Sequence, residues 1–132
     1  MSNAIGEILD GLNDMYDSFV QGDRQRFDTH LDIELTAWES HLPRLVDREG
    51  LDSYRDRRTP EEIPRVTEMR IVDPAIDVWG DRALARYELV SIPVDADEPV
   101  QFRRVTDVLR RTDSGWRIIH HHAELVKEPV HD

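Results

Sequence analysis

The spacing of apolar residues changes along this chain, from a helical period in the first third to alternation in the last half. Over residues 4–21 the apolar residues recur at i, i+3, i+4 and i+7, which is typical of an amphipathic helix. Two shorter helices are predicted after it, at 23–31 and 47–57, with a short strand at 33–38 between them. The alternating part predicts strands at 65–72, 75–79, 82–92, 100–112 and 115–126. Because the helices come first and the strands follow, we expect an α+β fold, with helices packed on one face of a mostly antiparallel sheet.

Length and charge limit the possible partners. The 132 residues are expected to form a single domain over 1–132, with no cysteine for disulfides or thiolate chemistry. The formal net charge of −11 repels nucleic acids and anionic membranes, so neither is expected as a partner. The first residues lack the basic and apolar regions of a signal peptide, and no run reaches the ~20 apolar residues of a membrane span. A cytoplasmic protein is therefore expected.

The last predicted strand, "GWRIIHHHAEL" at 115–125, carries three consecutive histidines. Strict alternation places His121 and Ala123 on one face, and on the other the residues Trp116, Ile118, His120, His122 and Glu124. Neither face is simply polar, so both are expected to be covered. The helices can cover only one, and a second copy of the chain is the simplest cover for the other. We therefore predict a homodimer through the face of Trp116, Ile118, His120 and His122.

Five segments in order resemble the nuclear transport factor 2-like superfamily, also called SnoaL-like or cystatin-like. The segments are "VQGDRQRF", "LTAWES", "REGLDSY", "DPAIDVWGD" and "TDVLRRTDSGWRIIHHH", and they run nearly end to end. They are most similar to the association domain of calcium/calmodulin-dependent protein kinase type II. The resemblance implies a cone in which a curved sheet wraps around the first helix, with a ligand pocket at its open end. It also implies dimers, which in the kinase stack into larger rings.

The chain departs from that family at the pocket positions. Where the family has two arginines, this chain has Asp107 and Ala123, and where it has a tyrosine and a histidine, this chain has Phe27 and Tyr54. An anionic ligand is therefore not expected, and a neutral or cationic small molecule suits these residues better. The pocket expected from the resemblance comprises Tyr16, Phe27, Trp38, Tyr54, Asp107, His121 and Ala123.

The residues leave several functions open. One is a small-molecule-binding and oligomerisation domain, and another is a purely structural dimer. A third is an acid–base enzyme, such as an isomerase, dehydratase or cyclase, in which the Asp107 carboxylate would orient the His121 imidazole. His120 and His122 could share a zinc ion, with the further ligand coming from Glu124, His30 or His41. No motif supplies that ligand at a recognisable spacing, so no metal or cofactor is expected.

Overall fold

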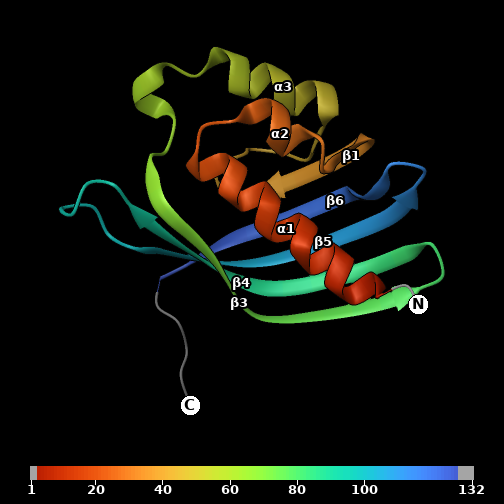
Figure 1. Ribbon diagram of the computed structural model, residues 1–132. Coiled ribbons are helices and arrows are strands. Elements are labelled where there is room, and N and C mark those ends of the chain that lie inside the picture. The colour runs from red at the N-terminus through yellow and green to blue at the C-terminus, as the bar shows by residue number, and fades with distance from the viewer. Residues whose placement is uncertain (1–2, 128–132) are drawn as a thin grey trace.

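The computed structural model describes residues 3–127, in which helices come first and a curved six-stranded sheet follows (Figure 1). The α-helices are α1 Ala4–Val20, α2 Arg24–Asp28 and α3 Arg48–Arg57, and a 3₁₀ turn lies at Pro60–Glu62. The strands are β1 Leu31–Glu39, β2 Val46–Asp47, β3 Val66–Trp79, β4 Arg82–Pro93, β5 Gln101–Thr112 and β6 Gly115–Val126. The predicted α+β fold is confirmed.

Short polar side chains set the helix starts. Asn3 accepts a hydrogen bond from the backbone N–H of Gly6 at the start of α1. Asp23 and Asp47 accept from the third residue beyond them and begin α2 and α3, as the sequence predicts. None of the helices among residues 3–127 is both long enough and apolar enough to cross a membrane.

The sheet is open and mixed, with the strand order β2-β1-β6-β5-β4-β3. β1 and β6 run parallel, and all other neighbours are antiparallel. The two strands predicted at 65–72 and 75–79 are one strand, β3, with a bulge between Val72 and Ala75. Asp73 in this bulge has a left-handed backbone (φ 51°), which aspartate tolerates better than most residues. The chain therefore bends there without ending the strand.

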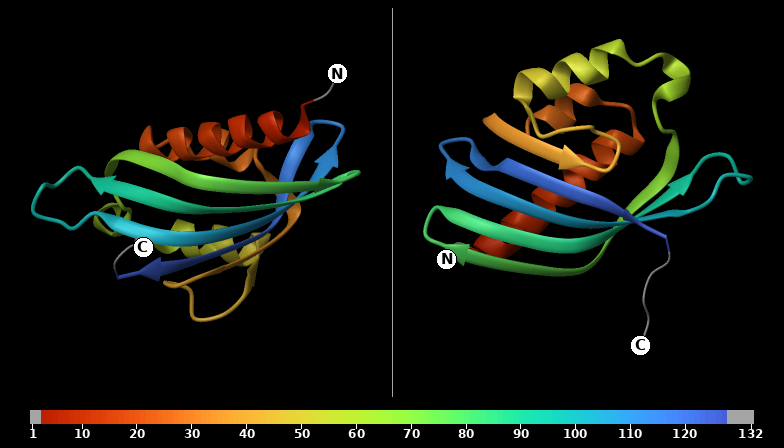
Figure 2. Two further views of the ribbon diagram at one scale, coloured as in Figure 1. Left: turned by 90° about the horizontal axis from the view of Figure 1, so that it is seen from below. Right: turned by 180° about the vertical axis from the view of Figure 1, so that it is seen from behind.

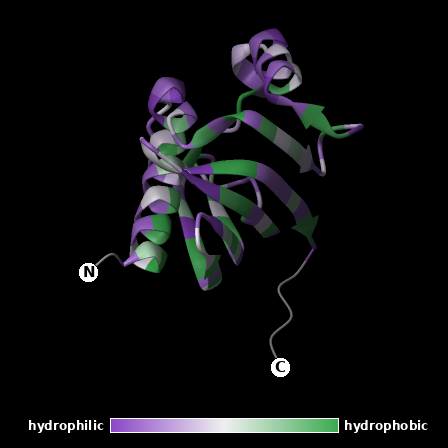
Figure 3. Cartoon of the chain, turned by 90° about the vertical axis from the view of Figure 1, so that its right-hand side faces the viewer, coloured by the Kyte–Doolittle hydropathy of each residue, from purple (hydrophilic) through white to green (hydrophobic). Residues whose placement is uncertain are grey.

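The sheet has two unlike faces. α1 lies along one of them, here called the helix face (Figures 1 and 2). The buried residues Ile8, Leu12 and Met15 of α1 share the core with Leu109 and Ile118 of the sheet. The opposite face, here called the open face, has no helix over β3–β6 in the part of the chain that the structure describes (Figure 2, right). Figure 3 shows the alternation of hydrophobic and hydrophilic residues along the strands.

A second bulge corrects the predicted faces of β6. Leu109 pairs with Ile118, but Val108 pairs with His120, so Ile119 is an extra residue that reverses the alternation. Ile118 therefore lies on the helix face, where it is 1% exposed in the core, and Trp116 packs against the same core. The prediction that these two residues share a face with His120 and His122 is wrong, because both pack against the core on the helix face.

Candidate functional site

A row of hydrogen-bonded polar side chains crosses the helix face beneath α1. The Tyr16 hydroxyl lies 2.6 Å from the Tyr87 hydroxyl, which donates to Oδ2 of Asp107 at 2.6 Å. Oδ1 of Asp107 lies 2.5 Å from Nδ1 of His121, and Nε2 of His121 lies 3.1 Å from Oε1 of Glu39. We call these five residues the polar row.

The sheet topology brings the row together. Tyr16 comes from α1, and the other four residues come from β4, β5, β6 and β1, which are adjacent strands in that order. Asp107 and His121 are directly paired across β5 and β6, so the prediction that these two residues meet is confirmed. Glu39 joins them only because β1 lies parallel to β6, where Ala37 pairs with His121.

The hydrogen bonds define where each proton lies. Tyr87 donates to Asp107, so Tyr16 must donate to the Tyr87 oxygen. Both imidazole nitrogens of His121 face carboxylate oxygens, which only accept. His121 can therefore satisfy both contacts only as the doubly protonated imidazolium. Each donor of the row is used within the row.

The ionisation of the row follows from these contacts. Burial alone would lower the pKa of His121, but the charge of Asp107 and the hydrogen bonds to Asp107 and Glu39 raise it to about 10. Burial would raise the pKa of Glu39, but the hydrogen bond and charge of His121 lower it to about 2. Burial and the charge of Asp107 raise the pKa of Tyr16 and Tyr87 well above 10. At neutral pH two carboxylates flank one imidazolium, so these three groups carry one excess negative charge.

The row runs from the core to the surface. Asp107 has no exposed surface, whereas the side chain of His121 is 15% exposed and that of Glu39 24%. The second oxygen of Glu39 lies 3.4 Å from Nε2 of His41, and the His41 ring lies 5.3 Å from the ring of Tyr54 in α3. Glu39, His41 and Tyr54 therefore form the outward end of the row.

The remaining residues of the expected pocket lie elsewhere. Trp38 is on the open face, 52% exposed, with its ring 6.1 Å from that of His122. Its neighbour Glu39 points to the helix face, so the alternation of β1 excludes Trp38 from a pocket shared with His121. Phe27 contacts Phe19, and Ala123 is buried in the core. Of the seven predicted pocket residues, the structure joins Tyr16, Asp107 and His121 in one hydrogen-bonded row.

His120 and His122 lie on the open face, as predicted. Nδ1 of His120 is 2.7 Å from the hydroxyl of Thr36, and His122 lies against Trp38. Within residues 3–127, no three His, Cys, Asp or Glu side chains converge in an arrangement that could hold a metal ion.

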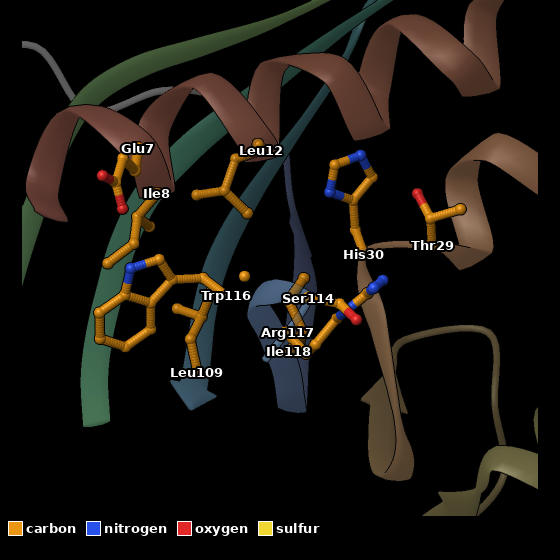
Figure 4. Close-up of a pocket in the computed structure, with 12 residues that line it drawn as sticks. Glu7, Ile8, Leu12, Thr29, His30, Leu109, Ser114, Trp116, Arg117 and Ile118 are labelled. Atoms are coloured by element: carbon orange, nitrogen blue, oxygen red, sulfur yellow. The ribbon is translucent and has the colours of Figure 1, made fainter. Parts of the chain in front are cut away.

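Two of the cavities within residues 3–127 are large enough for a small molecule, and neither is lined by Asp107 or His121. The larger, about 510 Å³, lies between α3 and the segment that joins β1 to it, and Thr36, Leu42 and Tyr54 contribute to its wall. The other, about 430 Å³, lies between α1 and the β5–β6 hairpin (Figure 4). The groups predicted to do chemistry are therefore packed into the protein and do not line either cavity.

The family model of the SnoaL-like domain matches residues 8–126. The chain belongs to the SnoaL-like family. No curated protein matches this SnoaL-like domain, but many solved structures do. One is a hub homology domain of CaMKII from Chlamydomonas reinhardtii, 23% identical, which covers 95% of this chain and 100% of its own, with a TM-score of 0.78.

Two further structures show the same fold. A proposed ketosteroid isomerase from Parabacteroides distasonis is 22% identical to this SnoaL-like domain, with a TM-score of 0.73 over 91% of this chain and 86% of its own. An NTF2-like protein with a cystatin-like fold from Novosphingobium aromaticivorans is 16% identical, with a TM-score of 0.76 over 96% of this chain and 84% of its own. The expected superfamily and its fold are confirmed.

Sequence reasoning missed two members of the polar row in this SnoaL-like domain. Tyr87 reads as an ordinary core aromatic, and only its contact with the buried Asp107 gives its hydroxyl a role. Glu39 is the last residue of β1 and lies 82 positions before His121 in the sequence. Only the parallel pairing of β1 with β6 brings the two side chains together. The one available signal was Asp107 itself, because an aspartate on the buried face of a strand requires hydrogen-bond donors around it.

Proposed function

We propose that this SnoaL-like domain is an assembly domain that dimerises through its open face and binds a neutral or cationic small molecule at the outward end of the polar row. The observation that carries the assembly is the contrast between the two faces of the sheet. α1 covers the helix face, whereas no helix among residues 3–127 lies over β3–β6 on the open face. The similarity to a CaMKII hub homology domain supports assembly by the same fold.

Cross-strand rows on the open face supply the contact groups. Leu84, Val108 and His120 are neighbours across β4, β5 and β6. Further along the same three strands, Val90 pairs with Phe102, and Phe102 pairs with Val126. Apolar rows of this kind beside the half-exposed Trp38 suit a self-complementary interface.

A charge placed on the open face is expected to break the dimer. Val108→Glu would bury an unpaired carboxylate between two copies, so we expect dimerisation at least tenfold weaker, which corresponds to ~1.4 kcal/mol. Sedimentation of the wild-type and variant proteins across the micromolar range measures this. Val94→Glu is the matched control, because Val94 is 52% exposed in the β4–β5 connection, and it should leave the mass unchanged. A wild-type protein that sediments as a monomer throughout would refute the assembly, and a mass of several dimers would indicate a larger ring.

The charge of the polar row supports a cationic ligand over an anionic one. Glu39 is ionised and is the carboxylate of the row that reaches the surface. His41 and Tyr54 beside it offer flat rings. A small cation with an apolar body would meet a carboxylate and aromatic faces there.

Two probes of equal size and opposite charge test this preference. Benzylamine should shift the amide signals of Glu39 and His41 in a saturable way, whereas benzoate should not. Glu39→Gln keeps an acceptor for His121 but removes the charge, so it should weaken benzylamine binding about tenfold. Equal shifts with both probes, or binding that Glu39→Gln leaves unchanged, would contradict the proposed ligand class.

The contacts favour binding over acid–base catalysis by Asp107 and His121. A general base needs an unprotonated atom within reach of the substrate, and both imidazole nitrogens of His121 already face carboxylates. A group whose pKa lies near 10 also stays protonated at neutral pH. The row is therefore better suited to hold Glu39 ionised and oriented than to transfer protons.

A further inference from the structure

Two tryptophans with exposed rings lie on the open face of the sheet. Trp38 of β1 is 52% exposed, and Trp79, the last residue of β3, is 61% exposed. Val78 packs against the core, so the alternation of β3 turns Trp79 to the open face, on which Trp38 also lies. A large apolar ring in water is unfavourable, and tryptophans that become buried anchor many protein interfaces. Both rings are therefore available as contact groups on this face.

The sheet places the two tryptophans symmetrically about one residue. From Trp38 the cross-strand pairs lead through β6 to Thr106 of β5. From Trp79 they lead through β4 to Arg110 of β5. β5 is two strands away from β1 on one side and two strands away from β3 on the other. Val108 lies midway between Thr106 and Arg110 on the open face, so it stands at the midpoint between the two tryptophans.

A twofold axis between two facing sheets can exchange the positions of the two tryptophans. Where the axis passes over Val108, at a right angle to the line from Trp38 to Trp79, each Trp38 faces Trp79 of the other copy. The two copies of Val108 then meet at the centre of the contact. A single arrangement therefore covers both exposed rings and the apolar residue between them.

The size of the open face suits a second copy of the chain. β4, β5 and β6 are 12 residues long, and β3 has 14 residues. With strands about 4.8 Å apart and a rise of about 3.3 Å per residue, these four strands cover roughly 750 Å². A stable interface of standard size buries about 800 Å² on each partner. The face is therefore large enough for a stable dimer without any further surface.

The charges of the open face favour a second copy over an acidic partner. The arginines that β4 and β5 place on this face are each paired with a carboxylate of the same chain. The pairs are Arg82 with Asp81, Arg86 with Asp77, Arg104 with Glu124 and Arg110 with Asp32. An acidic macromolecule would have to displace these carboxylates, whereas a second copy can pack its apolar groups between the pairs.

We propose that the two copies of the dimer meet with Trp38 of each packed against Trp79 of the other, and with Val108 on the twofold axis. This arrangement rests on the proposed dimer through the open face and adds which residues anchor it. Because the two contacts are identical by symmetry, replacing either tryptophan removes both of them.

Alanine variants of the two tryptophans test this pairing. Each contact should contribute about tenfold to dimerisation, so Trp38→Ala and Trp79→Ala should each weaken the dimer about a hundredfold. The double variant should be little weaker than either single variant, because each single change already removes both contacts. Sedimentation over a range of protein concentrations measures all three. Ile5→Ala is the matched control, because Ile5 is 50% exposed on α1 at the other side of the sheet, and it should dimerise like the wild type.

A mixture of the two single variants gives a sharper result. In a mixed dimer, one contact between Trp38 and Trp79 is lost and the other is intact. The mixed dimer should therefore be about tenfold tighter than the dimer of either variant alone. At a concentration at which each variant alone sediments as a monomer, the equimolar mixture should contain dimer, which also shows that both variants fold.

Three results would overturn the pairing while the wild-type protein still dimerises. The single variants could dimerise as tightly as the wild type, or the double variant could be weakened by the product of the two single effects. The mixed dimer could also be no tighter than the average of the two variants. Each of these results leaves the proposed dimer in place, whereas a monomeric wild type removes both the dimer and this pairing.

Discussion

Asp107→Asn is expected to destabilise the domain by about 3 kcal/mol or more, although it changes hardly any volume. Both oxygens of Asp107 accept hydrogen bonds, one from Tyr87 and the other from His121. Asparagine has only one accepting oxygen, so its amide would face a hydroxyl or an imidazolium that also donates. The variant also leaves the charge of His121 balanced by Glu39 alone. Urea unfolding at one fixed protein concentration measures the loss, because assembly would make stability depend on concentration.

The control uses the same substitution on an exposed residue. Asp10→Asn on the surface of α1 should change the free energy of unfolding by less than ~0.5 kcal/mol. Replacing both partners, as Asp107→Leu with His121→Leu, should cost less than the sum of the two single changes, because it leaves no buried charge without a partner. If Asp107→Asn lowers the free energy of unfolding by less than ~1 kcal/mol, the hydrogen bonds of Asp107 do not stabilise the fold as we expect.

The second large effect is a loss of stability as the pH rises. The histidine of an unfolded chain loses its proton near pH 6.5, whereas folded His121 keeps its proton up to about pH 10. Between these values the unfolded state binds fewer protons, so stability falls as pH increases, by on the order of 1 kcal/mol per pH unit. Glu39 acts in the opposite direction, since its stabilisation is lost as the pH falls from 4.5 to about 2. The contributions of both groups are complete only between about pH 4.5 and 6.5.

Two measurements check this pH dependence. The urea concentration at the midpoint of unfolding should fall steadily as the pH rises from 6 to 9.5. The double variant, Asp107→Leu with His121→Leu, should show a weaker dependence on pH. Nitrogen NMR of the imidazole rings gives a direct result, because both nitrogens of His121 should remain protonated at pH 8. A neutral His121 ring at that pH would contradict the assigned proton positions and the charge at Glu39.

Local patterns predicted most of the fold. The apolar face of α1, the capping residues Asp23 and Asp47, and four strands lie close to where spacing and turn residues place them. These features depend on neighbours within a few residues, which the sequence shows directly. The predicted pairing of β5 with β6 also placed Asp107 beside His121 correctly.

The parts that could not be predicted depend on distant partners or on one extra residue. Ile119 follows Ile118 in an apolar pair, and nothing in the local pattern shows that it is the bulge. Trp38 and Glu39 are adjacent, and without the pairing of β1 nothing indicates which of them faces α1. The candidate site was therefore predicted as a pocket but is a packed row, whose outward residue is a glutamate that local spacing does not identify.

The parallel contact of β1 with β6 has a consequence for how the chain matures on the ribosome. β1 can find its sheet partner only after residues 115–126 have been synthesised. Until then Asp107 has no imidazolium and Glu39 has no donor, so a nascent chain that ends before β6 would carry two repelling carboxylates toward its own core. We therefore expect this domain to fold in one late step, once β6 has been synthesised, and a stop codon within β6 to yield a product that cells degrade.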